Sequence, residues 1–196
     1  QQSSQRAVIN WDTFNLGSAA TVNFAQPNAQ AVTLNRVNDA NPSQIYGNIN
    51  APGQVFLSNP SGLYFSPTSQ VDVGSFTATT HSISDDNFMA GNYHFTTPSA
   101  DSLNVLNPSI LNQGQITSAA GGYIHLIGHN LQNQGTINAP GGTVGLLAGD
   151  TVSLNLSSNG NLIPAALTAT TNDDAVISNS GTINADHGTV QLSAYN

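Results

Sequence analysis

The feature that most constrains this chain is a sequence repeat in its C-terminal half. The repeat is summarised as N-x-G-x-I-x-A-x-x-G-x-[VI]-x-L, and its three copies begin at Asn112, Asn133 and Asn179. The first two copies start 21 residues apart, whereas the second and third start 46 residues apart. A period of about 20 residues is typical of stacked-repeat architectures. We therefore expect either a coil of divergent sequence or a coil with an inserted loop between the second and third copies.

The repeat has a physical meaning as strands and turns. Apolar residues two positions apart point to one face of a strand, and glycine and Asn-x-Gly steps occur where a chain turns. Two short strands and two tight turns make one coil of a β-solenoid. A single coil cannot bury its apolar residues alone, so coils stack at about 4.8 Å and share one linear core. Ile116, Ile137 and Ile183 hold one place in the repeat, and we expect them to form an aligned ladder inside this core.

Two segments break the period, at about 75–107 and about 150–176. Within the first, Ile83–Phe88 predicts a single helical turn capped by Ser84 or Asp85, and a short strand follows it. Within the second, the Asn159-Gly160 step predicts a hairpin. We expect both segments to form small antiparallel sheets outside the solenoid, in a single all-β domain that covers residues 1–196.

The composition excludes several classes of partner. Only 6% of the residues are charged, the formal net charge is −8, and Arg6 and Arg36 are the only basic residues besides five histidines. Nucleic acid is a poor partner because phosphate neutralisation needs clusters of Lys and Arg, and a polybasic membrane anchor is excluded for the same reason.

The absence of cysteine removes disulfides, thiol catalysis and Cys-based metal sites from consideration. No apolar run approaches the roughly 18–20 residues of a membrane span. No signal peptide is visible and the sequence starts at Gln1, so we interpret it as a processed or truncated fragment.

A solenoid enzyme is the main alternative in function, because parallel β-helices include polysaccharide lyases and hydrolases. A lyase needs a basic proton acceptor and often carboxylates on Ca²⁺, and a hydrolase needs two carboxylates across the scissile bond. The pairs Asp85-Asp86 and Asp173-Asp174 are adjacent in sequence, so on a strand their members point to opposite faces. His125 and His129 bracket a strand end and Gly128 rather than sharing a helix face. We therefore predict no catalytic residue, no metal site and no cofactor.

Two further alternatives stay open from the residues alone. Arg36 is either a solvated strand residue or a structural clamp on a carbonyl or carboxylate. Tyr46, Tyr64 and Tyr93 either fill the core and cover solenoid edges or stack on a sugar, which would make the chain a carbohydrate- or receptor-binding module.

Four sequence motifs carry a family resemblance that covers nearly the whole chain. They are Ala7–Phe14 (AVINWDTF), Asn41–Gly47 (NPSQIYG), Val55–Leu63 (VFLSNPSGL) and Ile83–Phe95 (ISDDNFMAGNYHF). Together they resemble the N-terminal secretion domain of two-partner secretion exoproteins, the filamentous-haemagglutinin family of large bacterial adhesins. The family's N-P-N-G motif is similar to Asn59–Gly62, with Ser61 where asparagine is usual.

The resemblance implies a right-handed parallel β-helix with small extra-helical sheets. It also implies a non-enzymatic secretion domain, recognised in the periplasm by the POTRA domains of a TpsB-type outer-membrane transporter, that nucleates folding of a much longer adhesin. A host receptor or glycan would be bound by the full-length protein, which would reach the cell surface through the Sec pathway and the transporter. We expect a monomer. The residues expected to carry transporter recognition belong to two Asn-Pro turns, Asn41, Pro42, Asn59, Pro60, Ser61 and Gly62.

Overall fold

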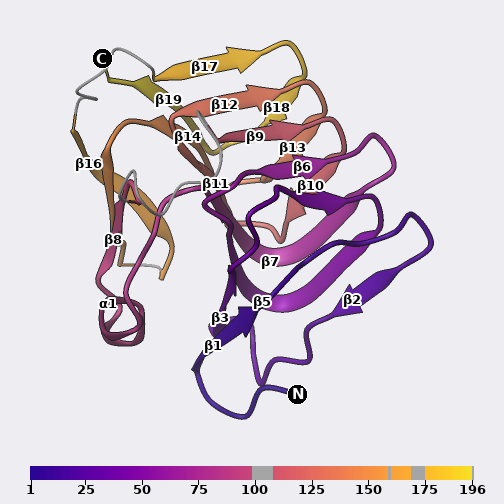
Figure 1. Cartoon of the computed structure of the whole chain (residues 1–196). Coiled ribbons are helices and arrows are strands. Elements are labelled where there is room, and N and C mark those ends of the chain that lie inside the picture. The colour runs from indigo at the N-terminus through magenta and orange to yellow at the C-terminus, as the bar shows by residue number, and fades with distance from the viewer. Residues whose placement is uncertain (99–107, 159, 169–174, 196) are drawn as a thin grey trace.

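The computed structural model describes residues 1–98, 108–158, 160–168 and 175–195 and contains three sheets. Successive coils stack from the N-terminal to the C-terminal end (Figure 1). The largest sheet has 11 strands, which are β1 (Arg6–Trp11), β2 (Thr21–Asn23), β3 (Val32–Val37), β5 (Asn48–Ser58), β7 (Gln70–Thr79), β10 (Gln115–Ser118), β11 (Tyr123–Gly128), β13 (Thr136–Asn138), β14 (Thr143–Ala148), β18 (Thr182–Asn184) and β19 (Thr189–Ala194). The second sheet is formed by β4 (Ser43–Ile45), β6 (Leu63–Phe65), β9 (Ser109–Asn112), β12 (Asn130–Asn133) and β17 (Val176–Asn179). All pairs in these two sheets are parallel, which confirms the parallel β-helix.

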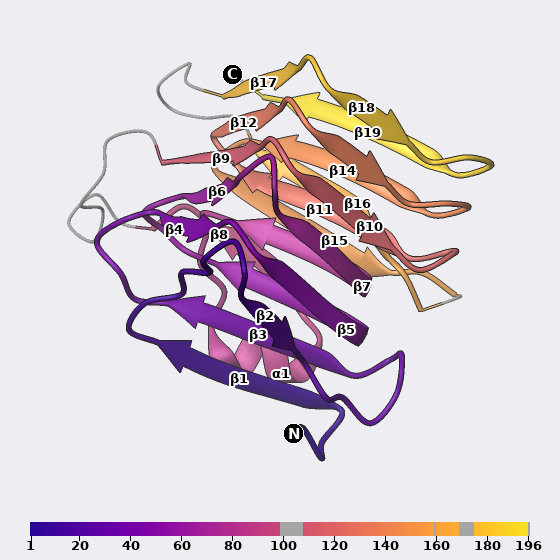
Figure 2. The same cartoon turned by 90° about the vertical axis from the view of Figure 1, so that its right-hand side faces the viewer.

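Each coil of the C-terminal half contains three strands rather than the two expected. The three coils are β9–β10–β11, β12–β13–β14 and β17–β18–β19 (Figure 2). The additional strand ends at the first residue of each repeat copy. It is so short that one apolar residue per coil marks it in the sequence, namely Ile110, Leu131 or Ile177. The first copy also departs from the summarised repeat, since Ser118 stands where the others have alanine and one more residue precedes the next strand.

The long interval between the second and third copies holds an insertion rather than a divergent coil, and the described part of this insertion contains strands β15 (Thr151–Leu156) and β16 (Leu162–Thr168). Strand β12 pairs directly with β17, β13 with β18 and β14 with β19. In this register Ile116 lies opposite Ile137, and Ile137 lies opposite Ile183. Ile116 and Ile137 are fully buried, whereas Ile183, in the last coil, is partly buried.

The third sheet is antiparallel and lies outside the solenoid. It consists of β16 (Leu162–Thr168), β15 (Thr151–Leu156) and β8 (Tyr93–Thr96), and it covers the outer face of β11 and β14 (Figure 1). A second apolar cluster fills the space between, with Phe56, Tyr123 and Leu147 on the solenoid side. Strand β11 is therefore buried along both faces. Asn159 of the expected hairpin turn lies outside the described residues, while Gly160 has a positive φ of 85°.

The first excursion starts later than the sequence indicated. Residues Ser75–Thr79 complete β7, which pairs with β5 on one side and β11 on the other, so the chain leaves the solenoid only after this strand. Helix α1 (Asp85–Ala90) follows, and the Ser84 side chain accepts a hydrogen bond from the backbone N–H of Asn87, as an N-cap does. The alternating pattern of Ser75–Thr79 has the same period inside and outside a solenoid, so it could not place this boundary.

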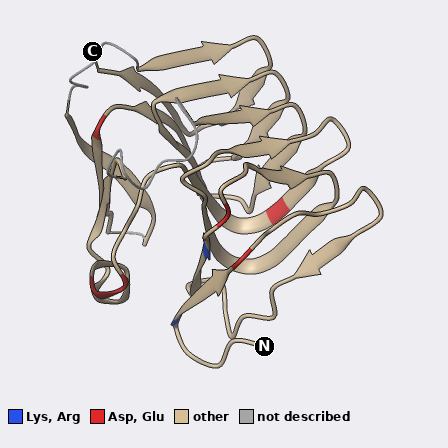
Figure 3. Ribbon diagram, viewed as in Figure 1, with Lys and Arg blue, Asp and Glu red and all other residues tan. Residues whose placement is uncertain are grey.

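Both arginines of the chain lie on strands of the first coils (Figure 3), and both fasten this excursion to those coils. Arg36 donates to the carbonyl of Ile83 at 2.8 Å and pairs with Asp85 at 2.6 Å. Arg6 donates to the carbonyl of Phe88 at 3.1 Å and to the hydroxyl of Tyr93 at 2.5 Å. Arg36 is thus the structural clamp of the two alternatives, and Arg6 has the same role.

Candidate functional site

The two Asn-Pro turns lie against each other on adjacent coils. Asn59, which is fully buried, donates from Nδ2 to the carbonyl of Asn41 at 3.1 Å and to Oγ of Ser43 at 3.0 Å. Its Oδ1 accepts from the backbone N–H of Ser61 at 2.9 Å. The side chain of Asn59 therefore uses both its donor and its acceptor to join the turns, and an apolar residue there would leave buried polar groups unpaired.

The second turn is closed by backbone bonds around Gly62. The N–H of Gly62 donates to the carbonyl of Asn59, and the carbonyl of Gly62 accepts from the N–H of Ser43, both at 3.0 Å. Gly62 has a φ of +119°, and a Cβ there would lie 3.0 Å from the carbonyl oxygen of Ser109 and 3.4 Å from Pro42. A residue with a side chain would thus be strained by the backbone and crowded by both neighbouring segments.

The expected recognition residues differ in exposure. Asn59, Ser61 and Gly62 are buried, Pro42 and Pro60 are half-buried, and Asn41 is exposed. Ser61 donates from Oγ to the carbonyl of Asp39 at 2.7 Å, so its hydroxyl braces the turn from within. The structure brings all six residues together, but a partner could touch only the surface that Asn41 and the two prolines form.

Sequence reasoning missed Asp39, which organises the first turn. Its carboxylate accepts from the backbone N–H of Asn41 at 2.9 Å and from the Asn41 side chain at 3.1 Å. An aspartate two residues before a turn residue is the pattern of an Asx turn, so the signal was present in the sequence.

Two buried histidines bond backbone carbonyls of the segment that leaves the solenoid after β14. His81 donates from Nε2 to the carbonyl of Gly149 at 2.6 Å, and His125 donates from Nε2 to the carbonyl of Leu162 at 2.9 Å. Burial lowers the pKa of each imidazole from 6.5 to about 4. His129 instead contacts Asp150 at 2.9 Å. Among the described residues, no group of three or more His, Cys, Asp or Glu side chains is arranged to hold a metal ion.

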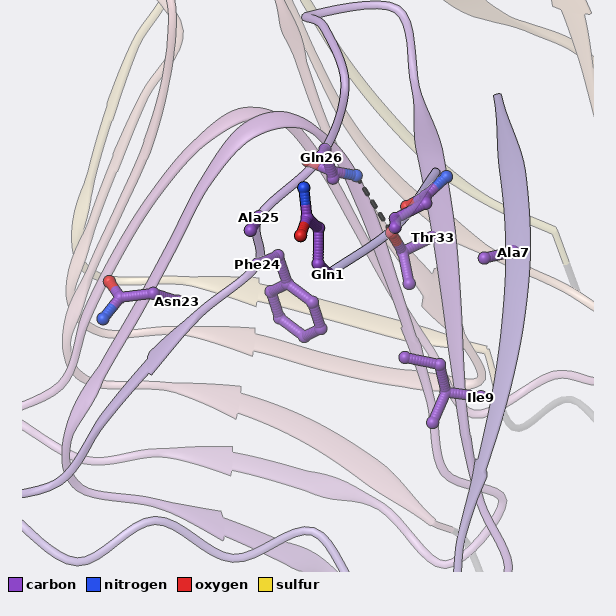
Figure 4. A pocket seen from close by; sticks show the side chains of 9 residues that line it. Gln1, Ala7, Ile9, Asn23, Phe24, Ala25, Gln26 and Thr33 are labelled. Atoms are coloured by element: carbon purple, nitrogen blue, oxygen red, sulfur yellow. Dashed lines mark hydrogen bonds between the residues drawn. The ribbon is translucent and has the colours of Figure 1, made fainter. Parts of the chain in front are cut away.

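The pockets of the described residues offer little acid–base chemistry. One pocket of about 230 Å³ lies at the N-terminal end, where Ile9, Phe24 and Gln26 line it, and no ionisable side chain faces it (Figure 4). An open hollow of about 460 Å³ is lined by Arg36, Asp85 and His94, but its one carboxylate is already paired with Arg36. The second expected acidic pair, Asp173-Asp174, lies outside the described residues.

The three tyrosines considered as sugar platforms differ in exposure. Tyr93 is 3% exposed and stacks on Phe56 at 5.4 Å between ring centroids. Tyr46 and Tyr64 pack edge to face at 5.8 Å on the solenoid edge, and the hydroxyl of Tyr64 donates to Gln113. Tyr46 keeps an exposed fraction of 40%.

The last coil, β17–β18–β19, has no coil stacked on its far side within the described residues (Figure 2). Val190 and Leu192 are 46% and 49% exposed, although the residues opposite them in β14, Val144 and Leu146, are fully buried. This surface is an unpaired edge in two sheets at once, since β17 ends one sheet and β18 and β19 end the other. An exposed edge of this kind is a template for further strands.

Comparisons with known proteins define the class of protein. The family profile described as the TPS secretion domain matches residues 1–196. The chain is 31% identical over 199 residues to a heme/hemopexin-binding protein of Haemophilus influenzae strain Rd, covering 98% of this chain and 21% of that protein. A second heme/hemopexin-binding protein from Haemophilus influenzae is 37% identical over 101 residues, which is 52% of this chain and 11% of that protein.

A solved structure agrees with the sequence matches. The crystal structure of the HMW1 secretion domain from Haemophilus influenzae superimposes with a TM-score of 0.86 at 30% identity, over 98% of this chain and 52% of that one. The present chain thus spans about a fifth of one matched relative and about half of the solved domain's chain.

The chain belongs to the TPS secretion-domain family of two-partner secretion exoproteins. Members of this family are exported through the Sec pathway and then across the outer membrane to the cell surface or beyond, and membership implies an interaction with a TpsB outer-membrane transporter. It is a family of secretion domains rather than a known enzyme family. Among the residues that the structure describes, no helix is long and apolar enough to span a membrane.

Proposed function

We propose that this domain is recognised by the periplasmic POTRA domains of its TpsB transporter and then nucleates β-helix folding of the exoprotein. The observation that carries the proposal is the last coil, whose core positions repeat those of the buried coil before it but lie open. The paired Asn-Pro turns are the proposed recognition element, because they present a fixed surface next to a sheet edge.

The physical argument concerns the direction of export. A chain that crosses the outer membrane meets no ATP on the far side. A solenoid folds coil by coil because each coil contacts only its neighbours. Each newly exported segment that pairs with the exposed coil is stabilised there, which biases movement outward. A domain with few charges and no cysteine is compatible with crossing in an unfolded state.

The proposal assigns no catalytic activity to the domain. Support comes from the clamped Arg36–Asp85 pair and from the absence of ionisable side chains around the N-terminal pocket, within the described part of the chain. Binding of a host receptor or glycan is proposed only for the full-length protein. The domain itself is proposed to act as a monomer.

The test of recognition is export of a reporter fused to the domain in cells that carry the cognate transporter. Gly62→Val should reduce export, because φ of +119° and the nearby carbonyl of Ser109 disfavour a β-branched residue. Gly160→Val is the matched control, since Gly160 also has a positive φ of 85° but lies in the extra-helical hairpin with open space around it. Circular dichroism of the purified variants separates a folding defect from a recognition defect.

Binding of purified POTRA domains to the folded variants completes the experiment. Export and POTRA binding of Gly62→Val at the wild-type level would contradict the assignment of the turn. Loss of both, with the Gly160→Val control unaffected, supports it.

A further inference from the structure

A ladder of asparagine side chains runs through the three C-terminal coils in one direction. Asn112 donates from Nδ2 to Oδ1 of Asn133 at 2.8 Å, and Asn133 donates from Nδ2 to Oδ1 of Asn179 at 2.7 Å. Asn112 and Asn133 are fully buried, whereas Asn179 is exposed. Asn133, in the middle coil, accepts from the coil before it and donates to the coil after it, so the ladder has one direction and ends on the amide of Asn179.

The donor at the end of the ladder is weakly used. Nδ2 of Asn179 lies 3.5 Å from the carbonyl of Gly181, at the limit of a hydrogen bond. A coil stacked on the last one would bury this N–H, and a buried donor without an acceptor is costly. The stacked coil therefore needs a neutral acceptor at this place. Asparagine supplies it and keeps a donor of its own, whereas aspartate would bury a charge.

Two columns of glycine set a second requirement. A Cβ on Gly135 would collide with the carbonyl oxygen of Gly114, and a Cβ on Gly181 would collide with that of Gly135. The same holds in the second column, where Gly142 meets the carbonyl of Gly122 and Gly188 meets that of Gly142. The carbonyls of Gly181 and Gly188 occupy the corresponding places in the last coil. A next coil can approach to the same spacing only with glycine opposite both.

We propose that the last coil is a selective docking face for one further parallel coil with asparagine opposite Asn179 and glycine opposite Gly181 and Gly188. The inference rests on the nucleation part of the proposed function and adds to it a rule for which segment is accepted. Apolar contact with Ile183, Val190 and Leu192 supplies affinity without much selectivity, since aliphatic residues of similar volume replace one another readily. The amide and glycine positions reject most other segments.

The experiment extends the full chain by one coil of its own sequence. Gly128, Ala148 and Ala194 are equivalent in the register, and Asn130 follows Gly128 by two residues. A copy of residues 131–148 joined directly after Asn196 therefore brings the copies of Asn133, Gly135 and Gly142 opposite Asn179, Gly181 and Gly188. Hydrogen–deuterium exchange measures protection of the added coil and of the Gly181–Ile183 amides beneath it.

Single changes in the added coil test the rule. Asn133→Ala, Gly135→Ala and Gly142→Ala in the copy should each reduce its protection by roughly tenfold or more. Gln134→Ala in the copy is the matched control, because Gln134 is exposed beside the ladder, and it should leave protection unchanged. Asn179→Ala in the domain should remove most of the additional effect of Asn133→Ala in the copy, since the two amides then no longer form a pair.

The outcomes separate this inference from the proposed function. Equal protection of all added coils overturns the docking rule and leaves nucleation standing. An added coil that is never protected overturns both the rule and nucleation, and POTRA binding measured on the same proteins shows whether recognition survives. Selective protection with loss of coupling in Asn179→Ala supports the rule.

Discussion

The coil β12–β13–β14 and the coil β17–β18–β19 share one sequence pattern and differ in what surrounds them. Val144 and Leu146 are fully buried, while Val190 and Leu192, at the same places one coil further, are about half exposed. The pattern therefore specifies the path of a coil, but burial comes from having a neighbour on each side. We therefore expect the last coil to be the less stable of the two.

The outer faces of the two coils differ as well. The extra-helical sheet covers β14, and Leu147 belongs to the second apolar cluster, whereas its partner in β19 is Ser193. One column of the same sheet contains His125, Gly145 and Gln191 in successive coils. The outward residue thus changes with the cover above it while the inward residues stay constant.

The largest expected effect compares Ile137→Ala with Ile183→Ala. Ile137 is fully enclosed, so its truncation should lower the free energy of unfolding by about 2–5 kcal/mol. Ile183 is only partly buried, and its truncation should cost less than about half as much. Chemical denaturation of both variants measures the difference. Equal losses would mean that the last coil is as well packed as the one before it.

Substitutions in the glycine columns should destabilise both coils by a similar amount, because a Cβ there meets only the preceding coil. Gly135→Ala and Gly181→Ala each bring a Cβ against a carbonyl oxygen of the coil before, that of Gly114 or that of Gly135. Both should lower the free energy of unfolding by about 1–3 kcal/mol, as overpacking does. Thermal and urea denaturation of the pair test this. A much smaller loss for Gly181→Ala would show that the last coil shifts freely away from its neighbour.

The smallest expected effect is a pH dependence that belongs to the covered coils. The folded-state pKa values of His81 and His125, about 4, lie below the usual 6.5, because burial disfavours the charged imidazole. Their contribution to stability is therefore complete above pH 6.5 and is lost as the pH falls towards 4. Between pH 7 and pH 6 each histidine should account for less than about 1 kcal/mol.

The variant His125→Gln isolates the contribution of the His125 imidazole to the pH dependence of stability. Glutamine can still donate to the carbonyl of Leu162, so the variant should flatten the dependence of the unfolding free energy on pH. Gln134, which is exposed and carries no titratable group, gives the control, because Gln134→Ala should leave the slope unchanged. An unaltered slope in His125→Gln would assign the acid sensitivity to other groups.

The sequence predicted the coils well because their positions repeat. The parallel solenoid, the alignment of Ile116 with Ile137 and Ile183, and the Ser84 cap of α1 all follow from local patterns. The third strand of each coil was missed because its two inward positions hold one apolar residue, such as Leu131, and one asparagine, such as Asn133, which leaves no apolar alternation to see.

The sequence identified the residues of the candidate site but not the contacts between them. Asn59, Pro60 and Gly62 predict a turn from the sequence. The hydrogen bonds from Asn59 to Asn41 and Ser43 depend on the stacking of two coils, which the sequence does not show. The roles of Arg6 and Arg36 could not be read from the sequence either. Their partners in the excursion are 47 to 87 positions away, and only the fold brings the excursion beside the first coils.

The engagement of both arginines inside the molecule has a colloidal consequence. With a formal charge of −8 and both guanidinium groups bonded within the molecule, the domain carries a net negative charge that repels a second copy. Two copies that diffuse together at neutral pH and low ionic strength repel each other before their uncovered strand edges can meet. Salt shortens this repulsion to about 10 Å at 0.1 M. We therefore expect self-association of the domain, measured by light scattering, to be weaker in dilute buffer than at high ionic strength.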